Sequence, residues 1–370
     1  MDIASFFSKQ PPPLLGLDIS ATSIKLVELG RDREGRFILE RWAHEPLERD
    51  WVSDGNIENF DQVAEALRRV VKKSGSRTRL AAMALPPSAV ITKKIILPGG
   101  LSEADLEVQV EIEANQYIPF SLDEVSLDFC LLGPSHANAG DVEVLIAASR
   151  REKVQDRQGL AEAAGLKPHI VDVETFAARL ATGRLIDSLP ISREGRDGRE
   201  AHDHRAEALV ALFEIGSHAT RLQVLRAGEA LYDRDQLFGG AQLTQLIARQ
   251  YGFTPEEAEQ RKRSGELPED YAAAVLRPFV DSLGQEIARS LQFFFTSTPH
   301  NRVDHVLLAG GSASLPGLPE AVAAHTSFPS SVADPFEGMV LATGARGHRL
   351  RQDAPGYLTA CGLAMRRFAW

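Results

Sequence analysis

The chain has 370 residues, 44% hydrophobic and 25% charged, with a net charge of −10 and two cysteines. A chain of this length exceeds the size at which one hydrophobic core keeps growing, so we expect at least two domains. The acidic balance argues against a nucleic-acid-binding protein, because the phosphate backbone would be repelled. Two cysteines are too few for a disulfide framework or a zinc site, which fits a reducing cytoplasm.

The first predicted element is a hairpin at residues 14–27. An apolar run ends at Asp18, small hydroxyl residues follow from Ser20 to Ser23, and a second apolar run carries Lys25. Turns rich in Gly, Ser and Thr leave backbone N–H groups and hydroxyls that can point at an anion. The turn is therefore a candidate phosphate site, although many ordinary hairpins also have polar turns.

Three further elements continue a mixed sheet. Residues 36–41 predict a third strand and residues 80–85 a short buried strand. Between them, apolar residues recur at helical spacing over 60–73, with lysines in the last turn and Gly75 beyond it. Strands interrupted by an amphipathic helix indicate a sheet that is covered by helices.

The following block is interpreted as an insertion. Ser102 and Asp105 form a capping pattern for a helix that continues to Tyr117 and ends before Pro119. Val108 and Ile112 make a second apolar row, so the same residues also fit an alternating strand, but the capping pattern and the acidic residues favour a helix. Strands are expected at 90–97, 125–132 and 142–148.

This block carries a resemblance to a known family. Residues 111–120 read EIEANQYIPF, followed by DEV at 123–125 and LDF at 127–129. These motifs, with Pro98 and SEADL at 102–106, resemble the PilM family, the cytoplasmic actin-like proteins of type IV pilus assembly. A helix that ends in Tyr-Ile-Pro-Phe exposes apolar groups at a chain break where a partner peptide can dock. The alternative is that the same four residues fill the local core.

The first half closes with two helices and a strand. Residues 151–164 and 174–186 predict helices, and residues 168–173 a strand between them. Residues 191–206 are rich in charge and glycine and lack an apolar period. We interpret this segment as the boundary between the two halves.

The opening hairpin has a second copy in the sequence. Residues 213–222 align without a gap on residues 17–26, so that Glu214 stands 196 positions after Asp18. Acid, isoleucine, small turn residues, cation and leucine occur in the same order in both. Two such turns suggest two related domains that face one ligand. Chance similarity of two hairpins is the alternative.

Two more segments of the second half are candidate ligand sites. Gly239 and Gly240 open a helix, where a ligand can approach the backbone at the positive end of the helix dipole, or where the chain only makes a tight corner. A buried strand then leads into Gly310-Gly311-Ser312, and glycines at such a place let a flat ring lie on the backbone. This last segment resembles the adenosine segment of the actin and Hsp70 superfamily.

The resemblance covers nearly the whole chain and implies an α/β fold. It is the actin-like (ribonuclease H-like) duplicated two-domain fold with an inserted FtsA/PilM-type subdomain. It implies a first domain at 1–206 with the subdomain at about 86–150, a second domain at 207–345, and a C-terminal helix within 346–370 that returns to the first domain.

The resemblance also implies that ATP and Mg²⁺ bind in the cleft between the halves. Asp18 would order metal-bound water, Glu259 and Lys262 would lie near the ribose at the spacing found in FtsA and PilM, and Gly311 would meet the adenosine. The full set expected to bind the nucleotide is Asp18, Ser20, Thr22, Ser23, Lys25, Glu214, Gly216, Ser217, Gly239, Gly240, Glu259, Lys262, Gly310, Gly311 and Ser312.

One residue departs from the pattern of the family. Many members have Asp where this chain has Glu214, and the longer side chain shifts the carboxylate by about a methylene length. No residue is assignable as a base aimed at a substrate hydroxyl. We therefore expect nucleotide binding with little turnover.

The role that the resemblance implies is that of a scaffold. Members of the family bind the N-terminal cytoplasmic peptide of the inner-membrane protein PilN and link it to the pilus motor ATPases and the platform protein. Tyr117, Ile118, Pro119 and Phe120 would lie close to the groove for that peptide. The protein would then lie at the cytoplasmic face of the inner membrane, held there by its partners. The alternatives are an FtsA-like filament-forming protein and an active ATPase or kinase.

Overall fold

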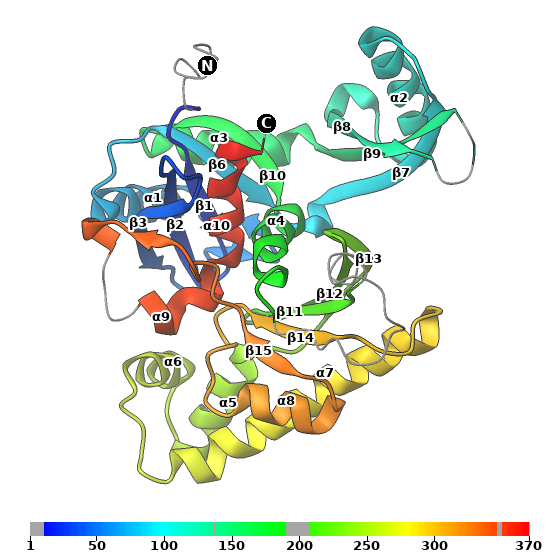
Figure 1. The fold of residues 1–370 in the computed structure, drawn as a ribbon. Helices are drawn as coiled ribbons and strands as arrows, with labels where there is room; N and C mark the ends of the chain where they lie inside the picture. Colours follow the sequence, from blue (N-terminus) through cyan, green and yellow to red (C-terminus); the bar gives the residue numbers. More distant parts are fainter. Residues whose placement is uncertain (1–10, 136–137, 139, 190–207, 346–349, 370) are drawn as a thin grey trace. The chain divides into compact units, whose positions relative to one another are not determined.

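The computed structural model describes residues 11–135, 138, 140–189, 208–345 and 350–369 (Figure 1). The predicted boundary at 191–206 lies outside these residues. The described chain divides into two compact units, one with residues 11–26, 43–176 and 366–369 and the other with 27–42 and 177–365. None of the described helices is long and apolar enough to cross a membrane.

The first sheet has the strand order β10-β6-β1-β2-β3-β16. β1 (Leu15–Ile19) pairs in parallel with β6 (Leu80–Leu85), and β6 pairs in parallel with β10 (Lys167–Val173). The other strands are β2 (Ser23–Arg31), β3 (Phe37–Pro46) and β16 (Val340–Leu341). Every residue of β1 is buried, which matches the apolar run that the sequence places there.

Helix α1 (Phe60–Ser74) forms where the sequence predicts it. The Asn59 side chain caps its first turn by accepting a hydrogen bond from the Gln62 N–H. Gly75 ends the helix with a φ of 66°, a left-handed conformation that glycine adopts without steric cost. Its apolar face, with Val63 and Leu67 completely buried, packs in one core with β1, β2 and α3 (Arg151–Ala163).

The second sheet repeats the order of the first. Its strands run β13-β12-β11-β14-β15, where the first sheet has β3-β2-β1-β6-β10. β11 pairs in parallel with β14, as β1 does with β6. The shared order confirms the predicted duplication, because chance similarity of two hairpins does not extend to three further strands. The strands are β11 (Val210–Ile215), β12 (Thr220–Arg226), β13 (Glu229–Gln236), β14 (His305–Ala309) and β15 (Ser330–Val332).

The helices of the second unit share a core with its sheet. α7 (Arg277–Ser297) buries Leu283, Ile287 and Leu291 against it. Pro278 is the second residue of α7, which continues directly from a π-helix at Ala272–Leu276, so its missing N–H removes a donor from a continuous helical run. The other helices are α5 (Gly240–Tyr251), α6 (Pro255–Ser264) and α8 (Leu318–Thr326).

The inserted subdomain is a three-stranded sheet with one helix. Its strands β7 (Val90–Pro98), β8 (Val125–Pro134) and β9 (Asp141–Arg150) lie in the order β7-β9-β8. Helix α2 (Glu103–Tyr117) confirms the helical alternative, since Ser102 caps it through the Asp105 N–H. Val108 and Ile112 are both 54% exposed, so the second apolar row does not enter the subdomain core.

The C-terminal helix packs closely on a neighbouring helix. α10 (Leu358–Met365) contacts α4 (Glu174–Ile186) at Gly362, where an added Cβ would lie 1.8 Å from the Ala177 carbonyl oxygen. Arg366 follows α10 and makes a bidentate ion pair with Asp172 of β10, with the shorter bond at 2.6 Å. α9 (Leu350–Asp353) precedes α10, and the two-residue strands β4 (Val52–Ser53) and β5 (Asn56–Ile57) complete the fold.

Candidate functional site

The first turn is held by its own backbone and hydroxyl groups. The Ser20 N–H donates to the Ser23 carbonyl at 3.0 Å, and the Ser20 hydroxyl donates to the same oxygen at 3.0 Å. Thr22 accepts a hydrogen bond at its carbonyl from the Leu47 N–H. Lys25 reaches back to Asp18 at 3.4 Å, and both side chains are largely buried. The turn therefore places a carboxylate, an ammonium and three hydroxyl residues within one hairpin.

The second turn closes with the corresponding hydrogen bond. The Gly216 N–H donates to the Ala219 carbonyl at 3.0 Å, which repeats the Ser20–Ser23 bond at an offset of 196 residues. A Cβ on Gly216 would lie 2.8 Å from that carbonyl oxygen, which explains the glycine. Glu214 lies opposite Arg221 in the strand register, and the Arg221 guanidinium makes two hydrogen bonds to Asp235 of β13.

Gly239 and Gly240 form a tight corner against the second turn. The Gly240 N–H donates to the Gly216 carbonyl at 3.0 Å, and the Ala241 N–H donates to the Ser217 carbonyl at 2.8 Å. These N–H groups, at the start of α5, are therefore already satisfied by the turn. A Cβ on Gly239 would lie 2.5 Å from the Gly216 carbonyl oxygen, so backbone packing by itself requires a glycine there.

The Gly310–Ser312 segment reaches the same corner from β14. Gly310 has a φ of 89°, and a Cβ there would meet the backbone of Ile215 at 2.5 Å. The Ser312 N–H donates to the Ile215 carbonyl, and a Cβ on Gly240 would lie 2.5 Å from the Ser312 hydroxyl. Gly311, in contrast, has open space where a Cβ would stand. The three glycine segments of the second half, far apart in sequence, thus meet at one place.

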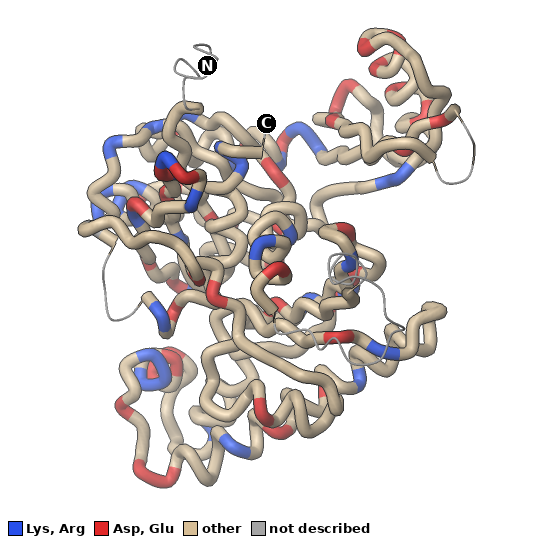
Figure 2. Tube along the Cα trace, in the orientation of Figure 1, with Lys and Arg blue, Asp and Glu red and all other residues tan. Residues whose placement is uncertain are grey.

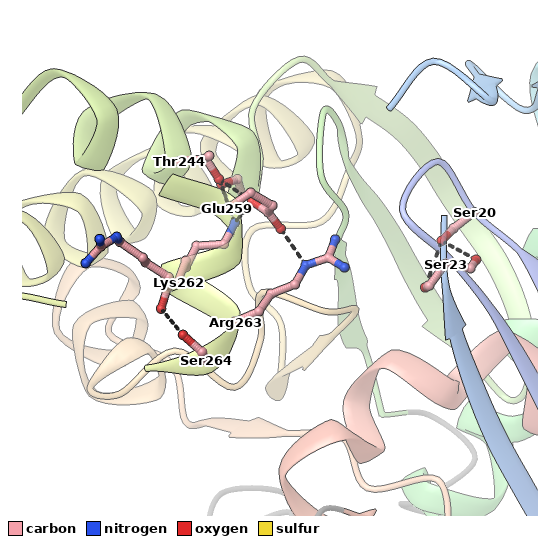
Figure 3. Close-up of polar contacts among 9 residues, drawn as sticks. Ser20, Ser23, Thr244, Glu259, Lys262, Arg263 and Ser264 are labelled. Carbon is pink, nitrogen blue, oxygen red and sulfur yellow. Dashed lines mark hydrogen bonds and ion pairs between the residues drawn. The ribbon is translucent and has the colours of Figure 1, made fainter. Parts of the chain in front are cut away.

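A charged network lies beside this corner (Figure 3). Glu259 of α6 accepts from Thr244 of α5 at 2.5 Å and pairs with Lys262 at 2.6 Å, while Arg263 binds its other oxygen at 2.8 Å. Lys262 also donates to the Thr244 hydroxyl at 2.7 Å and to the Gly240 carbonyl at 3.4 Å. Burial by itself would raise the pKa of Glu259, but Lys262 and the hydrogen bonds outweigh it and hold the pKa at about 2.

A pocket of about 300 Å³ adjoins the network. Lys262 and Gly265 line it from α6 and its C-terminal cap, Leu315 and Pro316 from the loop after Ser312, and Tyr271 from the segment before α7. Its size matches the lower end of small-molecule pockets, and its lining combines apolar groups with one cation. Sequence reasoning missed Thr244 and Tyr271. Only Thr244 had a signal, since it lies one helical turn after Gly240.

The carboxylate expected to meet a metal ion is that of Asp18 in the first turn. The described residues contain no group of three or more His, Cys, Asp or Glu side chains that could hold a metal. Asp18 is a single buried carboxylate beside Lys25. Because Mg²⁺ usually keeps several waters and takes one or two carboxylates together with substrate phosphates, a single Asp fits such an ion.

The Tyr117–Phe120 segment at the end of α2 has some residues that fill the subdomain core and others that are exposed and accessible to a partner. Ile118 is buried in the subdomain core, as the core-filling alternative expects, and Phe120 packs partly against it. Tyr117 is 44% exposed with the Lys93 ammonium 4.8 Å from its ring centroid, and Pro119 is exposed. The Arg150 guanidinium lies 4.2 Å from the Phe120 ring centroid. The segment therefore offers an aromatic, cation-flanked surface.

Comparison with known proteins identifies the family. The family model of the type IV pilus assembly protein PilM matches residues 16–368. The chain belongs to the PilM family of type IV pilus assembly proteins. The structure of a PilM–PilN type IV pilus biogenesis complex contains a chain that is 27% identical, with 96% of this chain and 98% of that chain covered and a TM-score of 0.74.

A second solved structure supports the fold. The ethanolamine utilization protein EutJ from Carboxydothermus hydrogenoformans is 18% identical over 96% of this chain and 90% of that chain, with a TM-score of 0.56. At that identity the likeness concerns the fold alone. Together with the duplicated strand order, the PilM family match confirms the actin-like two-domain fold with the inserted subdomain.

Proposed function

We propose that the protein is a nucleotide-binding scaffold of the inner-membrane assembly complex of a type IV pilus. In this role it binds ATP with Mg²⁺ and the N-terminal cytoplasmic peptide of a PilN-type protein, and couples that protein to the pilus motor and platform. The observation that carries the nucleotide part is the convergence of Gly216, Gly240 and Ser312 beside Lys262 and a pocket of about 300 Å³.

The proposal assigns a part of the nucleotide to each segment. Lys262 and Glu259 bind near the ribose, and the backbone at Gly311 supports the flat base, because no side chain stands there. The hydroxyls and Lys25 of the first turn hold phosphate, and Asp18 orders water on the metal. When bound, Mg²⁺ neutralises phosphate charge. The N–H groups at the start of α5 already donate to the second turn, so they are not free to bind phosphate. The phosphate contacts in this proposal therefore come from hydroxyl groups and a lysine.

Gly311→Val tests the nucleotide site. The added side chain meets open space in the protein, so we expect unchanged thermal unfolding but at least tenfold weaker ATP binding by calorimetry, since a branched side chain collides with a ring on the backbone. The control is Gly338→Ala in the same unit, at a glycine with a φ of 72°, which should alter stability and leave ATP affinity unchanged. Equal ATP affinity of parent and Gly311→Val would place the base elsewhere.

Slow turnover follows from the same residues. Glu214 replaces the Asp of many family members, and no residue at the site is assigned as a base. We expect ATP binding to be measurable while phosphate release stays far below one per second, the low end of ordinary enzyme turnover. Steady release at about one per second or faster would contradict the scaffold reading and favour an active ATPase.

The peptide part of the proposal draws on the 27% identical chain, which was solved in a PilM–PilN complex. We place the peptide near Tyr117 and Phe120, whose rings are flanked by Lys93 and Arg150. Aromatic anchors beside cations are typical of binding hot spots, and they suit a peptide with apolar and carbonyl groups.

Calorimetry with a PilN-type N-terminal peptide tests this placement, with and without ATP. The double variant Tyr117→Ala/Phe120→Ala should lose at least tenfold in affinity, because hot-spot aromatics contribute 2 kcal/mol or more, as a rough guide. The matched control is Val108→Ala/Ile112→Ala, which removes two exposed apolar side chains of α2 and should bind as the parent does. Equal loss in both variants would point to damage of the subdomain, and no binding by the parent would refute the scaffold role.

A further inference from the structure

One surface of the first unit carries a charge opposite to that of the chain as a whole. Seven cations lie on the exposed side of α1, on the segment that leads to β6, and at the start of β10: Arg68, Arg69, Lys72, Lys73, Arg77, Arg79 and Lys167. We call these seven residues the basic patch. Figure 2 shows Lys and Arg gathered around α1 in a protein whose net charge is −10. Only Glu45 and Glu65 pair with patch cations in the described part of the chain.

The ion pairs leave more than half of the patch uncompensated. Glu65 binds Arg68 at 2.6 Å, and Glu45 binds both Arg69 and Lys73. Among the described residues, no carboxylate pairs with Lys72, Arg77, Arg79 or Lys167. Lys167 is tied to the others through its backbone N–H, which donates to the Arg79 carbonyl at 2.7 Å. Four exposed cations therefore project a local positive field.

The patch is also hollowed. A pocket of about 510 Å³ lies between the C-terminal ends of α1 and α3. Its charged lining consists of Arg68, Lys72 and Arg79, and Ser76 and Gly165 complete its polar wall. Such a hollow suits a compact anion such as a phosphodiester group, because three cations, two from α1 and one from the segment before β6, line it.

The composition of the patch decides between kinds of partner. Protein interfaces depend on a central apolar or aromatic anchor, and no large exposed hydrophobic residue is found at 65–79 or at 167. An anionic lipid surface needs no such anchor, since clusters of four to eight Lys and Arg bind it through charge. We propose that the basic patch binds the anionic surface of a phospholipid membrane, with a headgroup phosphate in the pocket. This contact is direct and independent of any peptide partner.

Vesicle co-sedimentation of the purified full chain tests the proposal. The probes are phosphatidylcholine vesicles with and without phosphatidylglycerol. Binding should require phosphatidylglycerol and should fall steeply as salt is raised, because surface charges are screened over about 10 Å at 0.1 M ionic strength. If the protein binds neutral vesicles as strongly as anionic ones, the proposal is overturned.

The decisive variant is Lys72→Gln/Arg77→Gln/Arg79→Gln. Each cation near an anionic surface contributes about fivefold, so we expect a loss of about a hundredfold in vesicle affinity. The matched control is Arg226→Gln/Arg249→Gln/Arg277→Gln, which removes the same charge from exposed sites of the second unit and should bind like the parent. Similar binding by the Lys72 variant and its control would refute the assignment to the patch.

Two further measurements distinguish a loss of charge from a loss of folding, and a lipid surface from another polyanion. Lys72→Arg/Arg77→Lys/Arg79→Lys keeps the charge and should retain binding within about threefold. If this variant loses binding as the neutral one does, charge is not the cause. Duplex DNA added as a competitor should displace the protein only weakly, and displacement at equal phosphate concentration would instead assign the patch to nucleic acid.

Discussion

The two hairpins that open the two sheets share a plan but use it differently. In the first, Lys25 turns back within the hairpin to Asp18, and Ser20 adds a hydroxyl bond to the backbone bond that closes the turn. In the second, Arg221 binds Asp235 on the next strand, and a glycine replaces Ser20. The first turn is thus polar and makes its side-chain contacts within its own hairpin, whereas the backbone of other segments packs directly on the second turn.

The reason for the difference lies in what packs on each turn. Gly239 and Gly310 bring two backbone segments onto the second turn and its strand, at distances that no Cβ can enter. In the first sheet, β6 occupies the place of β14, yet it ends at Leu85 and is followed by Pro86. Duplication preserved the strand order, while close packing in one copy and hydroxyl groups in the other distinguish the two turns.

Gly310→Ala should have the largest effect on this comparison. A Cβ would meet the Ile215 backbone at 2.5 Å in a left-handed conformation, so we expect a loss of about 3 kcal/mol in the free energy of unfolding. Urea unfolding measures it. The control Gly311→Ala has open space and should lie within about 0.5 kcal/mol of the parent. Equal stabilities of the two variants would mean that the second turn is not closely covered.

Exchanging the turn residues should give unequal costs. Gly216→Ser puts a Cβ 2.8 Å from the Ala219 carbonyl and should cost about 2 kcal/mol. Ser20→Gly removes one hydroxyl hydrogen bond and makes the backbone less rigid, so it should lower the free energy of unfolding by about 1 kcal/mol. Thermal unfolding of both variants compares them. If Ser20→Gly proves the more harmful, the first turn is the more constrained of the two.

The charged network at Glu259 should make stability depend on pH. The pKa of Glu259 is lowered to about 2, below its value of about 4.3 in an unfolded chain. Its contribution is therefore fully present above about pH 5 and is lost as the pH falls toward 2. Because the side chain is one third exposed, we expect about 1 kcal/mol.

Glu259→Gln should remove this dependence. Urea unfolding of parent and variant should differ by about 1 kcal/mol at neutral pH and converge in acid, since the protonated parent and the amide variant then resemble each other. The control is Glu337→Gln in the same unit, because the described residues offer that carboxylate no such network, and it should leave the parent curve unchanged. A constant difference between parent and Glu259→Gln at every pH would assign the effect to packing.

Arg221→Lys should have the smallest effect. The bidentate contact with Asp235 becomes a single one, and Asp235 is 47% exposed, so we expect about 0.5 kcal/mol. A double-mutant cycle with Asp235→Asn isolates the pair. A coupling energy above about 2 kcal/mol would show that the pairing of β12 with β13 depends on this ion pair far more than the exposure of Asp235 suggests.

Local signals in the sequence predicted most of the elements. Asn59 and Gly75 delimit α1 within one residue. The capping box of Thr254 and Glu257 at the start of α6 is a local signal that was not used. β15 and β16 were missed, because two or three residues are too few to show a period. The sequence also left open whether Val108 and Ile112 are exposed. The spacing of residues shows that they share one face of the helix, but it does not show whether another element covers that face.

The sequence by itself determined the repeated hairpin, the ends of the helices and the motifs of the PilM family, because each depends on residues only a few positions apart. Only the tertiary structure decided that Gly216, Gly240 and Ser312 meet, that Thr244 joins Glu259 and Lys262, and that α1, the segment before β6 and the start of β10 share a basic surface. Those relations depend on strand pairing and side-chain packing between segments up to about a hundred residues apart. Such contacts become favourable only when the whole core forms, so no short window of the sequence contains them.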